Sequence, residues 1–462
     1  MIFTFFTVVG YGVVLAAARA PEAPLILLSP TIGAAVVVLP TMLANYLGMP
    51  VQFAGPPLAL VLLVASGLII ARSPRPKLPR WFFVIAWALL LGLVLNAWPM
   101  FIYGRNWMAF MNGDMQTYVN TAANIFARGF LVPPDAHAYI QQRTMTIPYE
   151  IRYVLLNHRS GAENLIAFWM SLLGRNAYEV YMPLIVAAQL ALISAATALV
   201  YDVRHGGRIP IATAIVLSCS PLMTLGVAHQ LLPQVLGIAL LIATLLLVCS
   251  PKPIKPLGAF LPMASLSGAV LAGFCAVYPE SAPILGATVF FYYAVAIVRR
   301  TINIPVACAW IGSTSAVAIL ALNAHITTVL QMIILTLSFS TGSVARWSAF
   351  SAYLIPSGLA DVFGFSAVAQ IEGSELTLAI ISGAALFLVT LVAMIALLRR
   401  GRMVGFGLAA MLLGVPLLFV HKNGFGLYKL AMYVQPFLVS TLLSWWGDLD
   451  IRAIPPIKIE SS

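Results

Sequence analysis

The sequence predicts an all-α, polytopic membrane protein of about 13 transmembrane helices, with amphipathic juxtamembrane helices in its first large outer loop. Apolar residues make up 61% of the 462 residues, whereas charged residues make up only 8%. A soluble domain typically carries about 25% charged residues, so this chain has too few to cover a water-facing surface. The composition excludes a soluble enzyme, a disordered protein and, despite a net charge of +11, a nucleic-acid binder with a water-facing basic patch.

Apolar runs long enough to cross a bilayer recur along the chain. A spanning helix needs roughly 20 mostly apolar residues, because the hydrocarbon is about 30 Å thick and each residue rises about 1.5 Å. Segments 163–174 and 324–340 are too short or too awkwardly placed to be counted as crossings. Spans are expected near residues 2–19, 24–46, 56–72, 81–102, 178–201, 209–228, 231–250, 258–278, 281–298, 304–322, 376–398, 402–421 and 426–446.

Basic residues collect in alternate connections, and this sets the expected orientation. One set of connections, which includes 72–80, 299–300 and 399–402, carries sixteen Lys and Arg residues against five acids. The other set carries nine of each, so the positive-inside rule makes the first set cytoplasmic. The N-terminus is then outside and the C-terminus inside. No cleaved signal peptide is expected, and a plasma (bacterial inner) membrane fits the lack of Asn-x-Ser/Thr sites.

The chain is expected to form one continuous helical membrane domain. Residues 1–79 supply three N-terminal spans, residues 80–450 form the main transmembrane domain with outer loops 103–177 and 323–375, and residues 451–462 form a cytoplasmic tail. The four cysteines stand singly in apolar runs, and no histidine cluster has the spacing of metal ligands. We find no tandem repeat and no evident inverted pair of interrupted helices.

The first outer loop contains the most informative segment, which begins at Gly113-Asp114 and ends at Gly129. Its pattern predicts an amphipathic helix lying at the membrane interface. Asp114 falls at the helix start, where it can cap the helix, serve as a catalytic carboxylate, or do both. The expected apolar face holds Met115, Tyr118, Val119, Ala122 and Phe126, and the polar face holds Thr117, Asn120, Thr121, Asn124 and Arg128.

A family resemblance rests on this loop. A span reaching the outer face, Gly113-Asp114, an amphipathic helix with an aromatic residue, and Gly129-Phe130 followed by prolines together resemble the first outer loop of the C-type (GT-C) membrane glycosyltransferases. The resemblance covers roughly residues 80–180. It implies a polyprenyl-phosphate-linked sugar donor and gives Asp114 the role of general base or acceptor orienter.

This sequence departs from the GT-C pattern in two respects. Three spans precede the span that carries the loop, whereas many members begin with that span. The loop also has Gly-Asp in place of the paired acidic residues frequent in the superfamily. A lone carboxylate is a poor divalent-cation site, so no metal ligand and no cofactor are assigned.

Sugar transfer from a lipid phosphate needs a base for the acceptor hydroxyl and cations for the departing phosphate. Asp114 is the expected base. Glu280, in the tight corner after Tyr278-Pro279, is the second candidate, with a helix-capping role as the alternative. The lysines and arginines that could bind the phosphate have alternative roles: a lysine near a helix end can extend its amine to the membrane surface, and the arginines of the loop can bind lipid headgroups. The expected phosphate-binding residues are His421, Lys422, Lys429, Arg152 and Arg159, and the expected substrate contacts are Tyr118, Tyr278 and Tyr428.

The leading hypothesis is therefore an enzyme. It would transfer a hexosyl or pentosyl group from a polyprenyl-phosphate donor to an envelope glycan, lipid or protein at the outer face of the membrane. The alternative is a transporter or flippase of a lipid-linked or anionic solute, which predicts ionisable groups near the middle of the spans, where this chain has almost none. A third hypothesis is a non-catalytic partner in an envelope-assembly complex.

Overall fold

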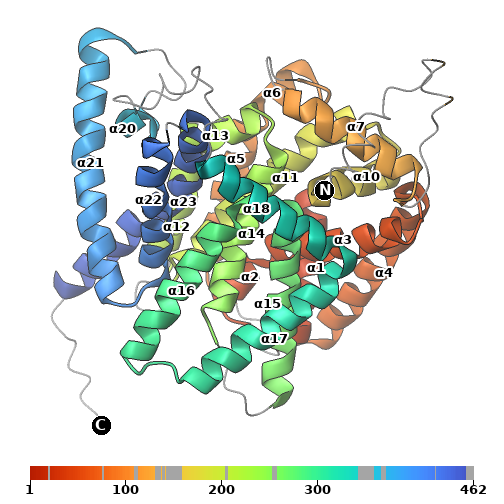
Figure 1. Cartoon of the computed structure of the whole chain (residues 1–462), viewed down its shortest axis with the longest axis horizontal. Helices are drawn as coiled ribbons and strands as arrows, with labels where there is room; N and C mark the ends of the chain where they lie inside the picture. Colours follow the sequence, from red (N-terminus) through yellow and green to blue (C-terminus); the bar gives the residue numbers. More distant parts are fainter. Residues whose placement is uncertain are drawn as a thin grey trace.

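The computed structural model describes residues 1–18, 21–74, 78–108, 113–130, 137, 141, 159–202, 206–251, 257–341, 358–365, 371–421 and 423–453. Helices account for all the regular structure in these ranges (Figure 1). In chain order they are α1 (Ile2–Ala17), α2 (Ala23–Leu27), α3 (Ser29–Tyr46), α4 (Val51–Arg72), α5 (Trp81–Asn96), α6 (Trp98–Tyr103), α7 (Gly113–Ala127), α10 (Gly161–Leu173), α11 (Ala177–Leu199), α12 (Arg208–Ser218), α13 (Pro221–Ala228), α14 (Leu232–Val248), α15 (Leu257–Val277), η2 (Pro279–Ser281), α16 (Ala282–Val298), α17 (Ile304–Leu322), η3 (Asn323–His325), α18 (Ile326–Thr341), α20 (Gly358–Asp361), α21 (Gly373–Arg399), α22 (Met403–Val420) and α23 (Gly424–Ala453).

The apolar helices make this a multi-pass membrane protein. Seven helical segments of the described chain are long and apolar enough to cross a bilayer. An eighth is added if α12 and α13, which bend by 51° at a short break, form one broken span. Three further apolar helices, α1, α5 and α14, are shorter. The expected count of 13 spans stays a prediction. Segment 324–340 mostly forms α18, and segment 163–174 belongs to the buried helix α10.

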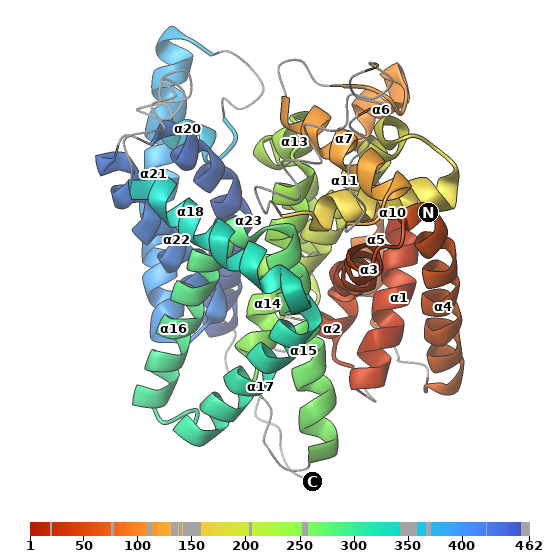
Figure 2. The same cartoon turned by 45° about the vertical axis from the view of Figure 1, so that its right-hand side comes forward.

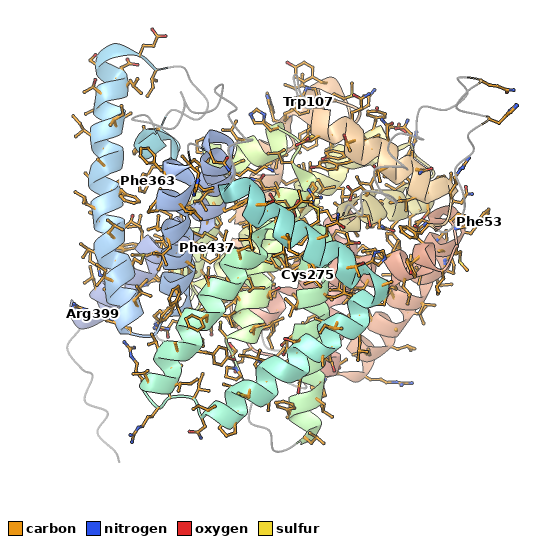
Figure 3. The ribbon with its side chains drawn as sticks, viewed as in Figure 1. Phe53, Trp107, Cys275, Phe363, Arg399 and Phe437 are labelled. Carbon is orange, nitrogen blue, oxygen red and sulfur yellow. The ribbon has the colours of Figure 1, made fainter. Side chains whose placement is uncertain are left out.

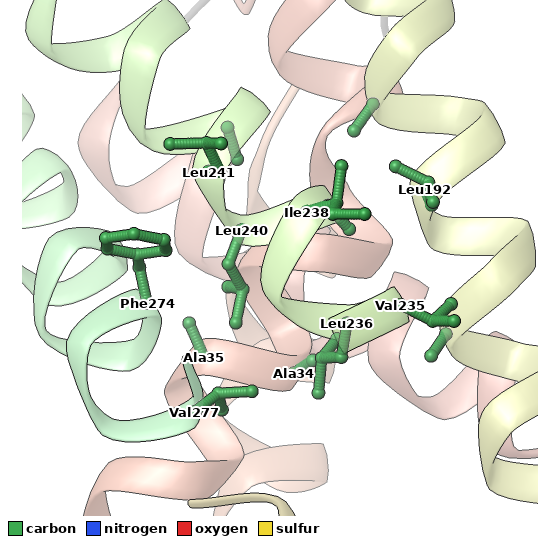
Figure 4. Packing of buried hydrophobic residues seen from close by; sticks show 14 of the residues in the cluster. Ala34, Ala35, Leu192, Val235, Leu236, Ile238, Leu240, Leu241, Phe274 and Val277 are labelled. Atoms are coloured by element: carbon green, nitrogen blue, oxygen red, sulfur yellow. The ribbon is translucent and has the colours of Figure 1, made fainter. Parts of the chain in front are cut away.

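Helices α11 and α14 form the centre of the bundle. Leu192 of α11 and the run Val235–Leu241 of α14 pack with α15 and with Ala34 and Ala35 of α3 (Figure 4). These two helices are buried nearly all round, whereas α4 and α21 expose many large apolar side chains. A helix that is apolar on every face is either a core helix or a lipid-facing span, so the outer helices present their free faces to lipid.

Close contacts between small residues tie the N-terminal helices to the body. A Cβ atom at Gly10 of α1 would overlap the Ser29 carbonyl, and one at Gly33 of α3 would overlap the Phe6 carbonyl. Small residues permit such close approach of helix backbones. The Ser194 hydroxyl on α11 donates to the Leu27 carbonyl at 2.6 Å. The first helices therefore belong to the same packed unit as α11.

One end of the bundle, here called the α7 end, gathers α6, α7, α10 and α13 (Figure 2). Trp107 lies at this end, and Arg399 lies at the opposite end (Figure 3). The Asn45 side-chain amide donates to the carbonyls of Ile125 and Arg128 at 3.2 and 2.8 Å, and thereby fixes the last turn of α7 on α3.

Helix α7 differs from the predicted interface helix in how much of it is buried. Thr121 and Asn124, which the pattern assigned to the polar face, are only 6% and 7% exposed. The reason is that α7 packs against α10, α4 and α11 instead of resting on a membrane surface by one face.

An ion-pair network closes the opposite end of the bundle. Arg400 pairs with Asp448, and Arg402 pairs with Asp202 and, at 3.9 Å, with Asp448. We call these four residues the Arg402 network. It joins the α11–α12 connection, the α21–α22 connection and α23, beside a cavity of about 200 Å³.

Candidate functional site

Polar and aromatic side chains from four separate parts of the chain come together at the α7 end. We call the following set the Arg159 cluster: Asp114 and Tyr118 of α7, Arg159 and Glu163 at the start of α10, Tyr278 and Glu280 at the α15–α16 corner, and Lys429 and Tyr433 of α23. A charged group within a membrane protein is expensive to bury, so such a gathering marks a candidate functional site.

Arg159 stands at the centre of the cluster. Its Nε donates to Glu280 Oε1 at 2.5 Å, and the two side chains are only 6% and 19% exposed. The guanidinium carbon lies 5.7 Å from the Tyr118 ring centroid and 5.3 Å from that of Tyr278. The Tyr278 hydroxyl is hydrogen-bonded in turn to that of Tyr433. Two aromatic faces and one carboxylate thus hold the arginine in place.

Electrostatics keep the arginine charged and the adjacent phenol neutral. Burial alone lowers the pKa of Arg159, but Glu280, Tyr118 and Glu163 outweigh burial and raise that pKa well above its usual value. Burial is also the main reason that the pKa of Tyr118 rises to about 12. At neutral pH the centre therefore offers a permanent cation beside a phenol that can donate a hydrogen bond.

Asp114 and Lys429 extend the cluster. Asp114 is exposed in the first turn of α7, where the helix dipole favours a negative charge. Lys429 interacts electrostatically with Glu280, Arg159 and Asp114, although it lies more than 300 residues from Asp114 in the chain. The arrangement combines an accessible carboxylate with two cations that are less exposed.

Glu163 and Tyr433 are members of the cluster that the sequence analysis missed. Glu163 is 2% exposed and interacts with Arg159, Tyr118 and Tyr181. The sequence does contain a signal for Glu163. An acid within a strongly apolar segment is energetically unfavourable unless it is paired, and Arg159 lies four residues earlier. Tyr433 follows Lys429 by four residues, which places both on one face of α23.

The structure unites six of the ten predicted site residues: Asp114, Tyr118, Arg159, Tyr278, Glu280 and Lys429. His421 is exposed just after α22, and its side chain makes no hydrogen bond or ion pair with the described residues. Lys422 and Arg152 lie outside the described residues, as does the side chain of Tyr428. Among the residues that are described, no three His, Cys, Asp or Glu side chains form a metal-binding group.

Comparison with known proteins does not identify a function for the Arg159 cluster, so its function is inferred from its chemistry. The chain matches no protein-family model, no curated protein and no solved structure. Chemically, an exposed carboxylate can take a proton from a hydroxyl group, and a neighbouring arginine and lysine can stabilise an anion.

Proposed function

We propose that the protein is a membrane glycosyltransferase that uses a polyprenyl-phosphate-linked sugar and acts at the outer face of the membrane. The observation that carries the proposal is the Arg159 cluster, because it unites three carboxylates, two cations and three phenols from four distant segments. The acceptor would be an envelope glycan, lipid or protein. The lipid tail of the donor would approach from the bilayer, which suits a site at one end of a membrane bundle.

Each residue has a distinct role in the proposed reaction. Asp114 accepts the proton of the acceptor hydroxyl as that oxygen bonds to the anomeric carbon of the sugar. The bond between the anomeric carbon and the phosphate oxygen breaks, and Arg159 and Lys429 stabilise the charge on the departing phosphate. The ion pair of Glu280 with Arg159 supports giving the base role to Asp114 and a positioning role to Glu280.

Reconstitution with a panel of polyprenyl-phosphate sugars tests the proposal. We expect Asp114→Asn to lower turnover by about 100-fold or more, because the amide cannot accept the proton. Released polyprenyl phosphate is the readout. Glu375→Gln is the matched control, since Glu375 is also an exposed acid in the first turn of a helix, and it should retain full activity. Full turnover by folded Asp114→Asn protein would refute the base assignment.

A transporter or flippase is the second candidate, and the broken span α12–α13 favours it. The break lies at Cys219-Ser220, where the Ser220 hydroxyl donates to the Gln435 side chain of α23 at 3.2 Å. Interrupted helices at a ligand path are typical of secondary transporters. Passage of a lipid-linked solute across the same vesicles without cleavage of any sugar–phosphate bond would support this candidate over the glycosyltransferase.

A further inference from the structure

Arg159 and Glu280 are held with unequal firmness, although they form one ion pair. Arg159 is 6% exposed and packs between the Tyr118 and Tyr278 rings. The Tyr278 ring is fixed in turn by its hydrogen bond to Tyr433. An arginine stacked between two aromatic faces keeps its position when a partner leaves, because the ring contacts do not depend on that partner.

Glu280 sits in a more open position. It lies in the three-residue helix η2, and its side chain is 19% exposed, about three times the fraction of Arg159. Oε1 accepts from Arg159 Nε, whereas Oε2 is buried and has no hydrogen-bond partner within the described residues. A carboxylate can accept up to about four hydrogen bonds, and its strongest pairing with arginine uses both oxygens. Because Glu280 pairs with Arg159 through one oxygen only, another anion can take its place beside the guanidinium.

The charges of the cluster disfavour a further anion while Glu280 stays in place. Asp114, Glu163 and Glu280 oppose Arg159 and Lys429, so the described ionisable side chains of the cluster carry a formal charge of −1. An approaching phosphate would meet net repulsion, which is strong where water is scarce. When the Glu280 carboxylate moves away from Arg159, the remaining side chains of the cluster sum to a formal charge of zero, and the guanidinium loses the carboxylate to which it is hydrogen-bonded.

We infer that an incoming phosphate group displaces Glu280 from Arg159, and that Glu280 is a resident counter-ion which occupies the anion position while the site is empty. When phosphate departs, the carboxylate returns. Glu280 is therefore a positioning residue that sets phosphate affinity and release. This inference rests on the proposed function for the identity of the anion as the donor's phosphate, but the exchange itself can be measured without sugar transfer.

The test measures phosphate binding to the purified full-length protein in nanodiscs by calorimetry. The probes are inorganic phosphate and farnesyl phosphate, a short polyprenyl phosphate, with farnesol as the uncharged comparison. We expect Glu280→Gln to bind the phosphate probes roughly tenfold more tightly than the wild type, because it removes the competing charge. Arg159→Gln should lose the binding. Glu179→Gln alters another glutamate paired with an arginine and should change nothing.

Several outcomes decide the inference. Unchanged or weaker phosphate binding by folded Glu280→Gln protein overturns it, as does an equal gain for farnesol. If Glu280→Gln does not fold, Glu280→Asp keeps the charge but withdraws it from Arg159, and this variant should also bind more tightly. Tighter binding of both probes identifies the phosphate as the recognised group, whereas tighter binding of farnesyl phosphate alone adds the lipid as a requirement. If the variants bind phosphate as expected but the reconstituted protein transfers no sugar, the proposed function is refuted while the inference about Glu280 holds.

Discussion

A single buried guanidinium organises the candidate site at the scale of residues. The side chain of Arg159 meets an aromatic ring on α7, another at the α15–α16 corner, and the carboxylate of Glu280, 121 residues later in the chain. Each of these groups limits how far the cation can move. A buried arginine is tolerated only when several partners compensate for lost hydration, and here those partners include rings as well as carboxylates.

The ring of Tyr118 should matter more to folding than its hydroxyl group. We expect Tyr118→Leu to lower the free energy of unfolding by about 2 kcal/mol more than Tyr118→Phe, because only the leucine variant removes the aromatic face from Arg159. Unfolding in mixed micelles by increasing denaturing detergent measures the difference. Equal stabilities for the two variants would show that the ring contact contributes nothing.

His229 gives the protein a pH-dependent component of stability. It follows α13, and burial lowers its pKa below the usual 6.5. Because the folded state holds the neutral form more strongly than the unfolded state does, this contribution is present above about pH 6.5 and is lost as the pH falls through the lowered pKa.

The measurement for His229 is the midpoint of thermal unfolding at a series of pH values. Between about pH 7.5 and pH 5, the wild type should lose more thermal stability than His229→Gln, which cannot become charged. A parallel decline in both proteins would remove His229 as a source of the effect.

The sequence predicted that several residues of the Arg159 cluster share one site, but not which of them pair with one another. Asp114, Arg159, Glu280 and Lys429 could be selected because charged side chains are rare and costly in so apolar a chain. Their mutual contacts depend on how distant helices pack, and no local pattern encodes this. The pairing of Arg159 with Glu280, instead of with a ligand, is therefore a result of the tertiary structure alone.

At the scale of elements, glycine contacts between α1 and α3 determine how closely these helices approach. The two helices cross with Gly10 and Gly33 facing the backbone of the opposite helix. A similar contact fixes the chain just after α7, where Gly129 lies against the backbone of Gly48 without room for a Cβ atom. The position of the site therefore depends on backbone contacts as well as on side chains.

Substitution at this crossing should be strongly destabilising. We expect Gly33→Ala to lower the free energy of unfolding by about 3 kcal/mol, because the added methyl group overlaps the Phe6 carbonyl and the helices must separate. Gly67→Ala on α4 is the control, since a Cβ there meets no atom within 4 Å. Similar unfolding midpoints for both variants would contradict the proposed close packing.

Helix α7 shows which part of an element can be predicted. Its existence and its apolar face followed from the 3.6-residue pattern, and Met115, Tyr118, Val119 and Ala122 are indeed buried. The burial of Thr121 and Asn124 on the polar face could not be predicted, because it comes from α10 and α4 packing on a helix that was expected to lie alone at the membrane surface.

At the scale of the whole molecule, α23 joins the two charged regions. It carries Lys429 and Tyr433 of the Arg159 cluster and Asp448 of the Arg402 network. Nineteen residues separate Lys429 from Asp448, which corresponds to about 28 Å of helix. A single helix therefore links the Arg159 cluster to the Arg402 network.

The Arg402 network should stabilise the whole fold. We expect Asp448→Asn to lower the free energy of unfolding by about 2 kcal/mol, because Arg400 and Arg402 lose a carboxylate that is 5% exposed. Glu375→Gln, which removes an exposed acid, should have no measurable effect. Detergent-induced unfolding followed by tryptophan fluorescence compares the two variants, and equal midpoints would exclude a stabilising role for the network.

The late position of α23 in the chain has a consequence for biosynthesis. A ribosome releases α7, α10 and the α15–α16 corner long before it releases α23, so Arg159 and Glu280 can meet on the nascent chain while Lys429 and Tyr433 are still missing. Every shorter translation product that stops before α23 therefore lacks one wall of the cluster. The order of the helices thus determines when the cluster is complete, because its full set of charges can assemble only after α23 has been made.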